Sequence, residues 1–440
     1  MKKPCLFWVL VVATFPLFAE TVLSGDFFIN NGTYFDSPFH ESVNTTGLTF
    51  YPTLEFYGDT IEFSATGSID TRTEEALRWG LVELYFTWYF SDYATMTAGR
   101  ISESISASRF FTPFSFNTSS NPMQIMESPH GFQASGRDQL SLSFFWQDWF
   151  ARLSVMPFTY VPALADIGSV WFPEEALPQE LQSPFSEDTY IHIEEIYYTE
   201  TVIPETDLTQ FSYLGLVGGN LFSVDISLLF FYGFPQHPLI VPSVFLKDGW
   251  GADYDIQLSP EYDLQYGPGF ALDWAWEGLR LYGEGYWNLH KPVLVSEIES
   301  SGKQIKSGIG IANVIELTAG ALYDLYFPQA SLHFSSEFRT SIFINTPNKY
   351  TTGMFTTLWV NSATARLFEG RLQMSIGLVN DFNEDADRNG GALLSDIVFA
   401  PEYNMSFYLT YPFIFGGVED YGFGMYTDVY ELTLGMRMSF

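Results

Sequence analysis

The stretch Leu279-Arg-Leu-Tyr-Gly-Glu-Gly-Tyr-Trp-Asn-Leu289 places a polar or tyrosine side chain at every even position, from Arg280 to Asn288, between mostly apolar ones. Successive side chains of a strand point to opposite faces, so this segment predicts a strand with one polar and one apolar face. The same period of two recurs in residues 82–90, 332–342 and 371–376. Because no helical periodicity lies between these segments, we predict an all-β protein.

Composition and hydropathy place these strands in a membrane. Aromatic residues make up 18% of the chain and charged residues only 16%, which is typical of a barrel with aromatic girdles at both membrane interfaces. Beyond residue 19 the longest uncharged run, 226–246, contains Gly233 and three prolines, so it predicts no spanning helix. Backbone groups in hydrocarbon must all be paired, which leaves a closed sheet. We therefore predict a transmembrane antiparallel β-barrel with its apolar face outward.

The connection lengths give an independent estimate of the strand count. Bacterial barrels alternate short periplasmic turns with longer extracellular loops. We predict about 18 strands, with 16 or 14 as alternatives, including a single strand over 252–276 and a turn at Gly218-Gly219-Asn220. Short turns are predicted at Gly58-Asp59, Gln147-Asp148 and Glu277-Gly278, and long outer loops at 106–130, 161–207, 234–251 and 291–307.

Residues 1–19 predict a cleaved signal peptide. They combine Lys2 and Lys3 with a short apolar run and a small residue, Ala19, before the first strand. A retained membrane anchor is the alternative, but Pro16 interrupts an already short run. We therefore expect a signal peptide at 1–19 and one barrel domain at 20–440. The single cysteine, Cys5, lies in the leader, which excludes disulfides from the predicted barrel.

The last eleven residues, Tyr430-Glu-Leu-Thr-Leu-Gly-Met-Arg-Met-Ser-Phe440, alternate again and end on an aromatic side chain. This segment resembles the C-terminal signal of Gram-negative outer-membrane barrels, and with the leader it makes the chain similar to the general porin class. The resemblance implies an outer-membrane location in contact with lipid. It also implies that the barrel assembly machinery reads the terminal strand.

A barrel of about 18 strands is wide enough for a water-filled lumen. The first predicted strand follows the leader directly, which leaves no room for an N-terminal plug. We therefore predict a porin-like channel for passive diffusion of small hydrophilic solutes. Two alternatives remain open: an adhesin or structural barrel, and a substrate-specific transporter for hydrophobic molecules without an open pore. The sequence also leaves open an oligomer.

The formal net charge is −33, which argues against nucleic acid as a partner. No Lys or Arg occurs from residue 153 to 246, while 161–207 is rich in acids from Asp166 to Asp207. An acidic mouth would attract cations and repel anions, so we predict a cation-leaning channel. Simple solubility of an outer loop is the alternative reading of this acidic segment.

Charged side chains on the polar face of the predicted strands are the candidates for lining the pore. Many are expected to pair across strands. By alternation they are Glu83, Arg152, Asp273, Glu277, Arg280, Glu284, Glu316, Asp324, Glu337, Arg339, Arg371 and Arg437.

Loop 106–130 is aromatic and almost uncharged at its start. An apolar loop exposed to water would be unfavourable, so we predict that it packs inside the barrel and narrows it. A loop packed over the mouth is the alternative. The candidate constriction residues are Arg109, Phe110, Phe111, Phe114 and Phe116.

One segment has a metal-like spacing. Asp385, Asp387 and Asn389, with Asp396 eleven residues after the first, match the D-x-D-x-N-G pattern of calcium loops. No helices are predicted around it, and acidic turns are common in barrels, so an ordinary turn is the alternative to a calcium site. No other cofactor is predicted.

The sequence predicts no enzyme. A hydrolytic barrel would need a nucleophile or an acid pair poised with histidine. The chain has no G-x-S-x-G motif, and its six histidines form no recognisable motif with serine.

Overall fold

The computed structural model describes residues 20–36, 41–71, 78–101, 105–108, 110–111, 113–114, 136–157, 180–182, 190–201, 208, 210–235, 238–246, 253–301, 304–346, 357–382, 389–416, 423 and 429–440. The predicted signal peptide lies outside these ranges. In them no helix has the length and apolar character needed to cross a membrane.

The described strands are β1 (Glu20–Asp36), β2 (Glu41–Tyr57), β3 (Ile61–Asp70), β4 (Arg78–Ser91), β5 (Ala94–Ile101), β6 (Arg137–Trp146), β7 (Trp149–Met156), β8 (Glu180–Gln182), β9 (Tyr190–Tyr198), β10 (Ser212–Leu221), β11 (Val224–Gly233), β12 (Leu239–Leu246), β13 (Asp253–Glu261), β14 (Gln265–Trp276), β15 (Leu279–Ser301), β16 (Gln304–Phe327), β17 (Ala330–Asn345), β18 (Thr357–Leu367), β19 (Leu372–Asp381), β20 (Gly390–Glu402), β21 (Met405–Gly416) and β22 (Val429–Ser439).

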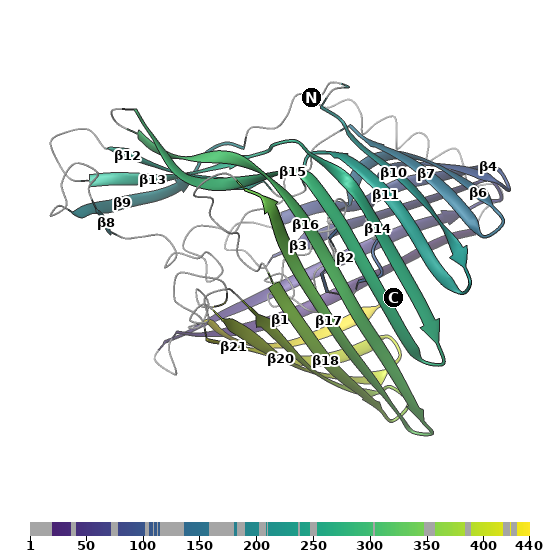
Figure 1. Ribbon diagram of the computed structural model, residues 1–440. Coiled ribbons are helices and arrows are strands. Elements are labelled where there is room, and N and C mark those ends of the chain that lie inside the picture. Colours follow the sequence, from purple (N-terminus) through teal and green to yellow (C-terminus); the bar gives the residue numbers. More distant parts are fainter. Residues whose placement is uncertain are drawn as a thin grey trace.

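All but β8, β9, β12 and β13 form one closed antiparallel barrel (Figure 1). The other 18 strands pair in chain order, with β7 next to β10 and β11 next to β14. β22 then pairs with β1 along Asp26–Asp36 and closes the ring. The predicted 18-stranded barrel is confirmed.

The closing seam is reinforced on both faces of the wall. Arg437 of β22 donates two hydrogen bonds to the Asp26 carboxylate of β1, at 3.0 and 2.9 Å, on the inner face. On the outer face the ring of Phe440 stacks on Phe50 of β2, with 5.9 Å between centroids. The backbones of Phe440 and Gly25 exchange two hydrogen bonds. The terminal aromatic side chain therefore reaches across the seam.

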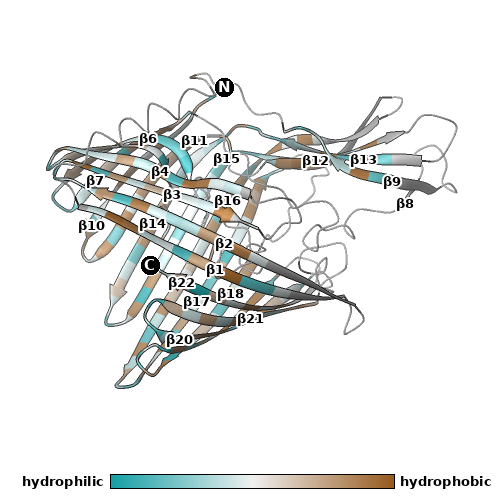
Figure 2. Cartoon of the chain, turned by 180° about the vertical axis from the view of Figure 1, so that it is seen from behind, coloured by the Kyte–Doolittle hydropathy of each residue, from teal (hydrophilic) through white to brown (hydrophobic). Residues whose placement is uncertain are grey.

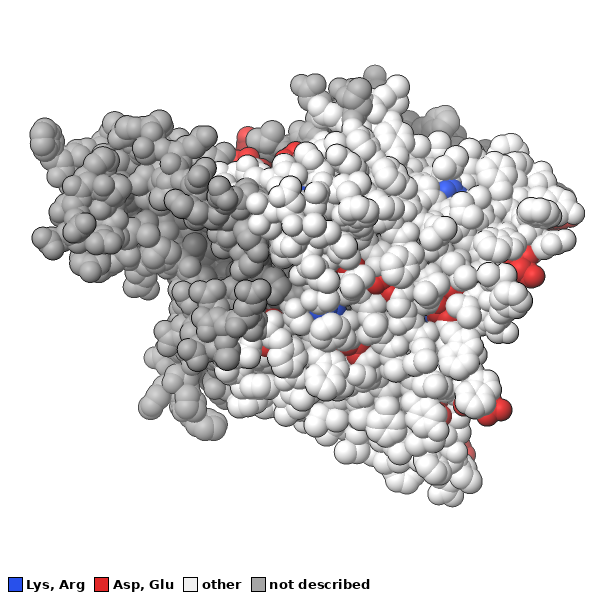
Figure 3. Space-filling model, viewed as in Figure 1, with Lys and Arg blue, Asp and Glu red and all other residues white. Residues whose placement is uncertain are grey.

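The outer face of the barrel is apolar and the inner face is polar. In β6, Leu140 and Phe144 are 44% and 48% exposed, whereas Ser141 and Ser143, which lie between them in the sequence, are buried. Figure 2 shows the same alternation of brown and teal along the strands, and the described surface is largely uncharged (Figure 3). An apolar outer wall is stable in a bilayer and not in water. The pleat thus fixes which side chains meet lipid and which meet the lumen.

β8, β9, β12 and β13 form an extension of the sheet at the loop end of the barrel (Figure 1). β12 pairs with β16 at Ser243–Phe245, β13 pairs with β12, and β9 joins β13 in parallel. Ile256 and Leu258 of β13 are buried in a small apolar cluster there.

Three segments predicted as loops contain strands, and one predicted strand is two strands. Segments 161–207 and 234–251 contain strands, and 291–307 is occupied almost entirely by the ends of β15 and β16. The predicted strand 252–276 is two strands, of which only β14 belongs to the barrel. Strand-like periodicity alone does not say which neighbours a strand pairs with, or whether it belongs to the closed barrel.

The turn between β10 and β11 lies beyond the predicted position 218–220. Its central residues, Phe222 and Ser223, have φ values of 52° and 67°, as in a type I′ hairpin turn. The Asn220 side chain caps the turn by accepting a hydrogen bond from the Ser223 backbone N–H at 3.2 Å.

Gly218 and Gly219 are residues of β10 and serve ring packing instead of the turn. A Cβ at Gly218 would lie 2.6 Å from the ring of Phe150, and one at Gly219 2.5 Å from the ring of Trp149. Both rings belong to the adjacent β7. The predicted turn at Gly218 and Gly219 is therefore wrong, because the two glycines make room for rings of a strand that is distant in the sequence.

We expect Ser223→Gly to stabilise the barrel by about 0.5–1 kcal/mol, because glycine adopts a positive φ without the steric penalty of a Cβ. Ser223→Val should destabilise it, since a β-branched residue fits this region poorly. Urea unfolding of the refolded barrel in micelles, followed by tryptophan fluorescence, measures both. Lower stability of the glycine variant would contradict the turn assignment.

Candidate functional site

Hydroxyl side chains line much of the inner wall and pair across strands. The Oγ atoms of Ser141 and Ser154 lie 2.7 Å apart, and those of Ser335 and Ser362 lie 2.6 Å apart. Small paired hydroxyls satisfy one another and leave space in the lumen. These hydroxyl groups of the polar inner face therefore form their hydrogen bonds with neighbouring strands of the wall.

A segment of the loop between β5 and β6 lies against the inner wall and covers Glu284 of β15. Ser106 donates its hydroxyl to both carboxylate oxygens, at 2.8 and 2.6 Å, and the backbone N–H groups of Ala107 and Ser108 donate to Oε1 at 2.5 and 3.2 Å. Glu284 is 1% exposed. Hydrogen bonds to a carboxylate are among the stronger ones in proteins, so this contact anchors the loop.

Glu337 of β17 forms a second anchor of the same kind. It accepts hydrogen bonds from Ser108 Oγ at 3.0 Å, from the Phe110 N–H at 3.3 Å and from the Phe111 N–H at 2.5 Å. Tyr282 of β15 donates its hydroxyl to Oε2 at 2.5 Å, the oxygen that also accepts from the Phe110 N–H. Glu337 is completely buried. Both carboxylates therefore bind the loop and do not face the open lumen.

Phe111 fixes the loop to an apolar part of the inner wall. Its ring is 1% exposed and packs in a cluster that includes Leu358, Val360, Val379 and Ile414, from β18, β19 and β21. Burying such a ring contributes about 2–3 kcal/mol. The Thr318 hydroxyl also donates to the Phe111 carbonyl at 3.0 Å.

Phe114 packs on a second apolar region, together with Ile105. Its neighbours there are inward residues of β7, β10, β11, β14 and β15, among them Leu214, Leu229 and Phe231. The described loop residues thus contact two apolar regions of the inner wall, one on β7–β15 and one on β18–β21. Glu284 on β15 and Glu337 on β17 lie where the first region gives way to the second.

Most other predicted pore-lining residues form pairs on the inner wall. Arg280 donates from Nε to both oxygens of Asp273 at 2.9 Å. Asp324 lies 2.6 Å from Nδ1 of His333, and Arg152 donates to Ser143 Oγ at 3.1 Å.

Glu316 forms an ion pair with Lys291 of β15, although its cross-strand partner there is Tyr286. Arg339 is cross-strand from Thr318, and its buried Nε has no hydrogen-bond partner among the described residues. Glu83 faces the lumen opposite Thr66. These positions agree with the predicted alternation.

Two of the predicted positions are not on the wall. Glu277 and Arg371 lie in the short turns after β14 and β18 and are exposed there. Glu277 has a φ of 43°, as expected for the first position of its turn. Arg109 and Phe116, predicted for the constriction, lie outside the described residues.

The inner wall carries more acidic than basic side chains among the described residues. The register places these acids on it: Asp26, Glu55, Glu62, Glu83, Asp225, Asp273, Glu284, Glu316, Asp324, Glu337, Asp381 and Asp396. The bases are Arg137, Arg152, Arg280, Lys291, Arg339, Arg366 and Arg437. Glu55 and Glu62 lie close together on β2 and β3, where the Tyr89 hydroxyl donates to Glu62 at 2.7 Å.

The proposed calcium ligands do not come together in the described part of the chain. Asp396 lies within β20, where its Oδ1 accepts a hydrogen bond from Thr410 at 3.0 Å. Asn389 precedes that strand, about 23 Å away along an extended chain. Asp385 and Asp387 lie outside the described residues, and the described residues contain no group of three or more His, Cys, Asp or Glu suited to a metal.

The apolar patches of the inner wall were missed by the sequence reading. A signal for them exists where the alternation breaks down, as in Leu228-Leu229-Phe230-Phe231 and Leu358-Trp359-Val360. Such runs are apolar on both faces, which in a barrel implies an inner surface covered by protein. Ser106, Ser108 and Thr318 carried no sequence signal as loop anchors.

We expect Glu284→Ala combined with Glu337→Ala to free the loop, because the N–H groups of residues 107, 108, 110 and 111 would lose their acceptors. Trypsin should then cut after Arg109 at least about tenfold faster than in the unchanged protein. Mass spectrometry of the fragments identifies the cut. Glu62→Ala is the matched control, and equal cleavage rates would contradict the two anchors.

Comparison with known proteins identifies the architecture. No family model and no curated protein matches the chain. It is similar to solved structures of Pseudomonas aeruginosa OccK5 (OpdH), at 9% identity and a TM-score of 0.50 over 96% of this chain and 98% of that one. A second is the outer membrane protein opdK of Pseudomonas aeruginosa, at 7% identity and a TM-score of 0.46 over 95% of this chain and 99% of that one. A third is Salmonella typhi OmpF in complex with daunomycin, at 8% identity and a TM-score of 0.44 over 96% of this chain and 97% of that one. The chain has the closed β-barrel fold of outer-membrane porins.

Proposed function

We propose that this protein is a channel for passive diffusion of small hydrophilic solutes across an outer membrane. The observation that carries the proposal is a loop bound along the inner wall of an 18-stranded barrel by two buried carboxylates. A barrel of this size has a lumen wider than a single small solute. A loop fixed against one side narrows the lumen and leaves the rest of the cross-section to water.

The anchoring chemistry supports a permanent constriction. The described hydrogen bonds that the loop donates to Glu284 and Glu337 come from backbone N–H groups and serine side chains, which have little freedom to rearrange. Phe111 and Phe114 then bury their rings on opposite sides of the anchors. Each contact holds the loop on the wall, so the solute path runs past the loop's free side.

The charge of the inner wall supports a preference for cations. With Glu284 and Glu337 covered, acids such as Glu55, Glu62 and Glu83 still outnumber the described bases on the wall. Lumen-facing charges of one sign concentrate the counter-ion and lower its barrier. We therefore assign the channel a cation preference.

The location in an outer membrane follows from the same proposal. The apolar outer wall requires a bilayer, and the porin fold and the terminal aromatic strand fit an outer membrane. In this proposal lipid surrounds the wall, and the barrel assembly machinery recognises the strand that ends at Phe440. The chemistry is transport, with no catalytic step.

Releasing the loop should enlarge the channel. We expect the Glu284→Ala, Glu337→Ala double variant to raise the single-channel conductance on the order of twofold, because the loop N–H groups lose their acceptors and the lumen is wider than its constriction. Planar bilayers with the refolded protein give the measurement. A silent barrel, in either form, would refute the channel.

The acids on β2–β4 should set the ion preference. In a salt gradient, the unchanged protein should give a reversal potential of the sign expected for cations. Changing Glu55, Glu62 and Glu83 together to Gln should move that potential toward zero, because the charges that attract cations are lost. The double variant at Asp273 and Arg280, changed to Asn and Gln, removes a neutral pair and serves as control. Anion preference in the unchanged protein would overturn the assignment.

A further inference from the structure

Three polar side chains are linked in a row on the inner wall, beside the short turn between β16 and β17. Nδ1 of His333 lies 2.6 Å from Oδ1 of Asp324, its cross-strand partner. Nε2 of the same ring lies 2.9 Å from Oγ of Ser331. Ser331 precedes His333 by two residues on β17, so both side chains point to the same face of the wall. One imidazole therefore connects a serine hydroxyl with a carboxylate.

These contacts determine which nitrogen of the ring carries the proton. An ionised carboxylate only accepts hydrogen bonds, so Nδ1 of the neutral imidazole donates to Asp324. Nε2 then has a lone pair, and the Ser331 hydroxyl donates to it. In this arrangement an imidazole acts as a base toward a serine hydroxyl, while the carboxylate holds the ring in the required tautomer.

The three side chains are accessible from the lumen at the end of the barrel away from the extension (Figure 1). The side chains of His333 and Asp324 are 19% and 35% exposed. Ser331 lies between its cross-strand partners, Tyr326 on β16 and Arg366 on β18, which are both exposed. A tyrosine hydroxyl and a guanidinium group are hydrogen-bond donors that can stabilise negative charge on a carbonyl oxygen. A small molecule that reaches the serine therefore has donors on both sides.

We propose that Ser331, His333 and Asp324 form a site that hydrolyses small carboxylic esters. Ser331 Oγ attacks the carbonyl carbon, and its proton passes to Nε2 of His333 and then to the departing alcohol. Water hydrolyses the resulting acyl-serine by the same route, which releases the acid and restores the serine. Ser331 and His333 are the catalytic residues, and Asp324 is a positioning residue that acts through the imidazole.

This reaction is a second function beside transport. Solutes reach the site from the short-turn end of the barrel, so the inference does not depend on whether the barrel conducts. The sequence predicted no enzyme because strand pairing, and not a sequence motif, brings Asp324 to His333.

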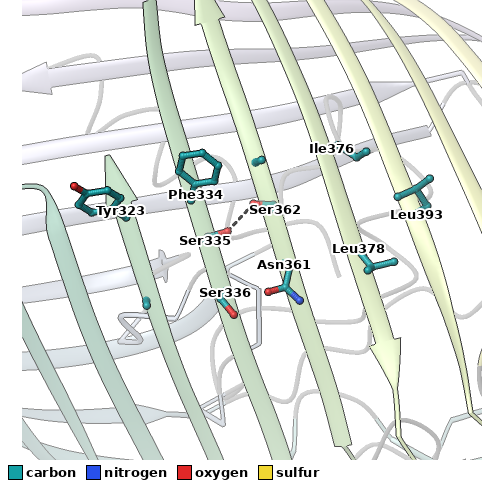
Figure 4. A pocket seen from close by; sticks show the side chains of 11 residues that line it. Tyr323, Phe334, Ser335, Ser336, Asn361, Ser362, Ile376, Leu378 and Leu393 are labelled. Atoms are coloured by element: carbon teal, nitrogen blue, oxygen red, sulfur yellow. Dashed lines mark hydrogen bonds between the residues drawn. The ribbon is translucent and has the colours of Figure 1, made fainter. Parts of the chain in front are cut away.

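A fluorophosphonate probe tests the nucleophile. The oxygen of an activated serine bonds to its phosphorus, and fluoride leaves. The refolded barrel in micelles should be labelled at Ser331, as identified by mass spectrometry of its peptides. His333→Gln should lower the labelling rate on the order of a hundredfold, because the base is lost. Ser335 is the matched control: it lies on the other side of His333 in β17, but its hydroxyl is bonded to Ser362 at 2.6 Å (Figure 4). It should remain unlabelled.

Turnover of para-nitrophenyl acetate tests the reaction. The unchanged protein should release about one nitrophenolate per barrel in a burst, followed by slower turnover. Ser331→Ala should abolish both phases. Asp324→Asn should lower kcat on the order of a hundredfold with KM little changed, because the imidazole then adopts the wrong tautomer while the ester still binds. Heat-dependent gel migration confirms that every variant is folded.

Three results overturn the proposal. They are the absence of label at Ser331, labelling of Ser331 no faster than that of Ser335, and a labelled Ser331 without ester turnover. A barrel that is silent in planar bilayers but labelled at Ser331 and active on the ester would refute the channel and leave the hydrolytic site standing.

Discussion

Backbone pairing in hydrocarbon is the constraint on which the whole structure depends. An unpaired N–H or C=O facing lipid is costly, so the sheet has no open edge in the membrane and β22 returns to β1. Closure fixes the register of each strand, and the register fixes which side chains face lipid. The bidentate pair of Asp26 with Arg437 and the ring of Phe440 lie at this seam because the two chain ends meet there.

Inside the closed wall, the loop between β5 and β6 is positioned by its contacts with the inner face. A purely hydrophilic inner face would give the loop nothing apolar to bind. The inner face instead has apolar regions on two sides of Glu284 and Glu337, and residues 105–114 cover both the carboxylates and these regions. Polar anchors give the loop its position, and buried rings supply much of the free energy that holds it.

The barrel could be predicted because its governing signal is local. Period-two alternation and short turns lie within a few residues of one another, as in 279–289 and at Glu277-Gly278, and both predictions were confirmed. The errors arose where the outcome depends on distant partners. The ring of Trp149 keeps Gly219 in a strand, and the pairing of β12 with β16 draws predicted loop residues into the sheet.

The candidate site was predictable only in outline. Alternation placed Arg280, Glu316 and Arg437 on the inner face, which the register bears out. It could not show that Glu284 and Glu337 lie beneath a loop, because the loop and β15 are separated by more than a hundred residues. Their burial depends on hydrogen bonds that have no sequence period.

The length of β15 and β16 affects how the barrel responds to force. They are 23 and 24 residues long and pair over roughly 75 Å, with register shifts between Asn288 and Lys291 and between Val295 and Ile298. They join the extension to the wall that holds Glu284. A lateral load on the extension would act on this ladder largely in shear, so that many hydrogen bonds share it at once. Displacement of the extension is then transmitted along this ladder toward the part of the wall on which the loop residues Ser106 and Ala107 are bound.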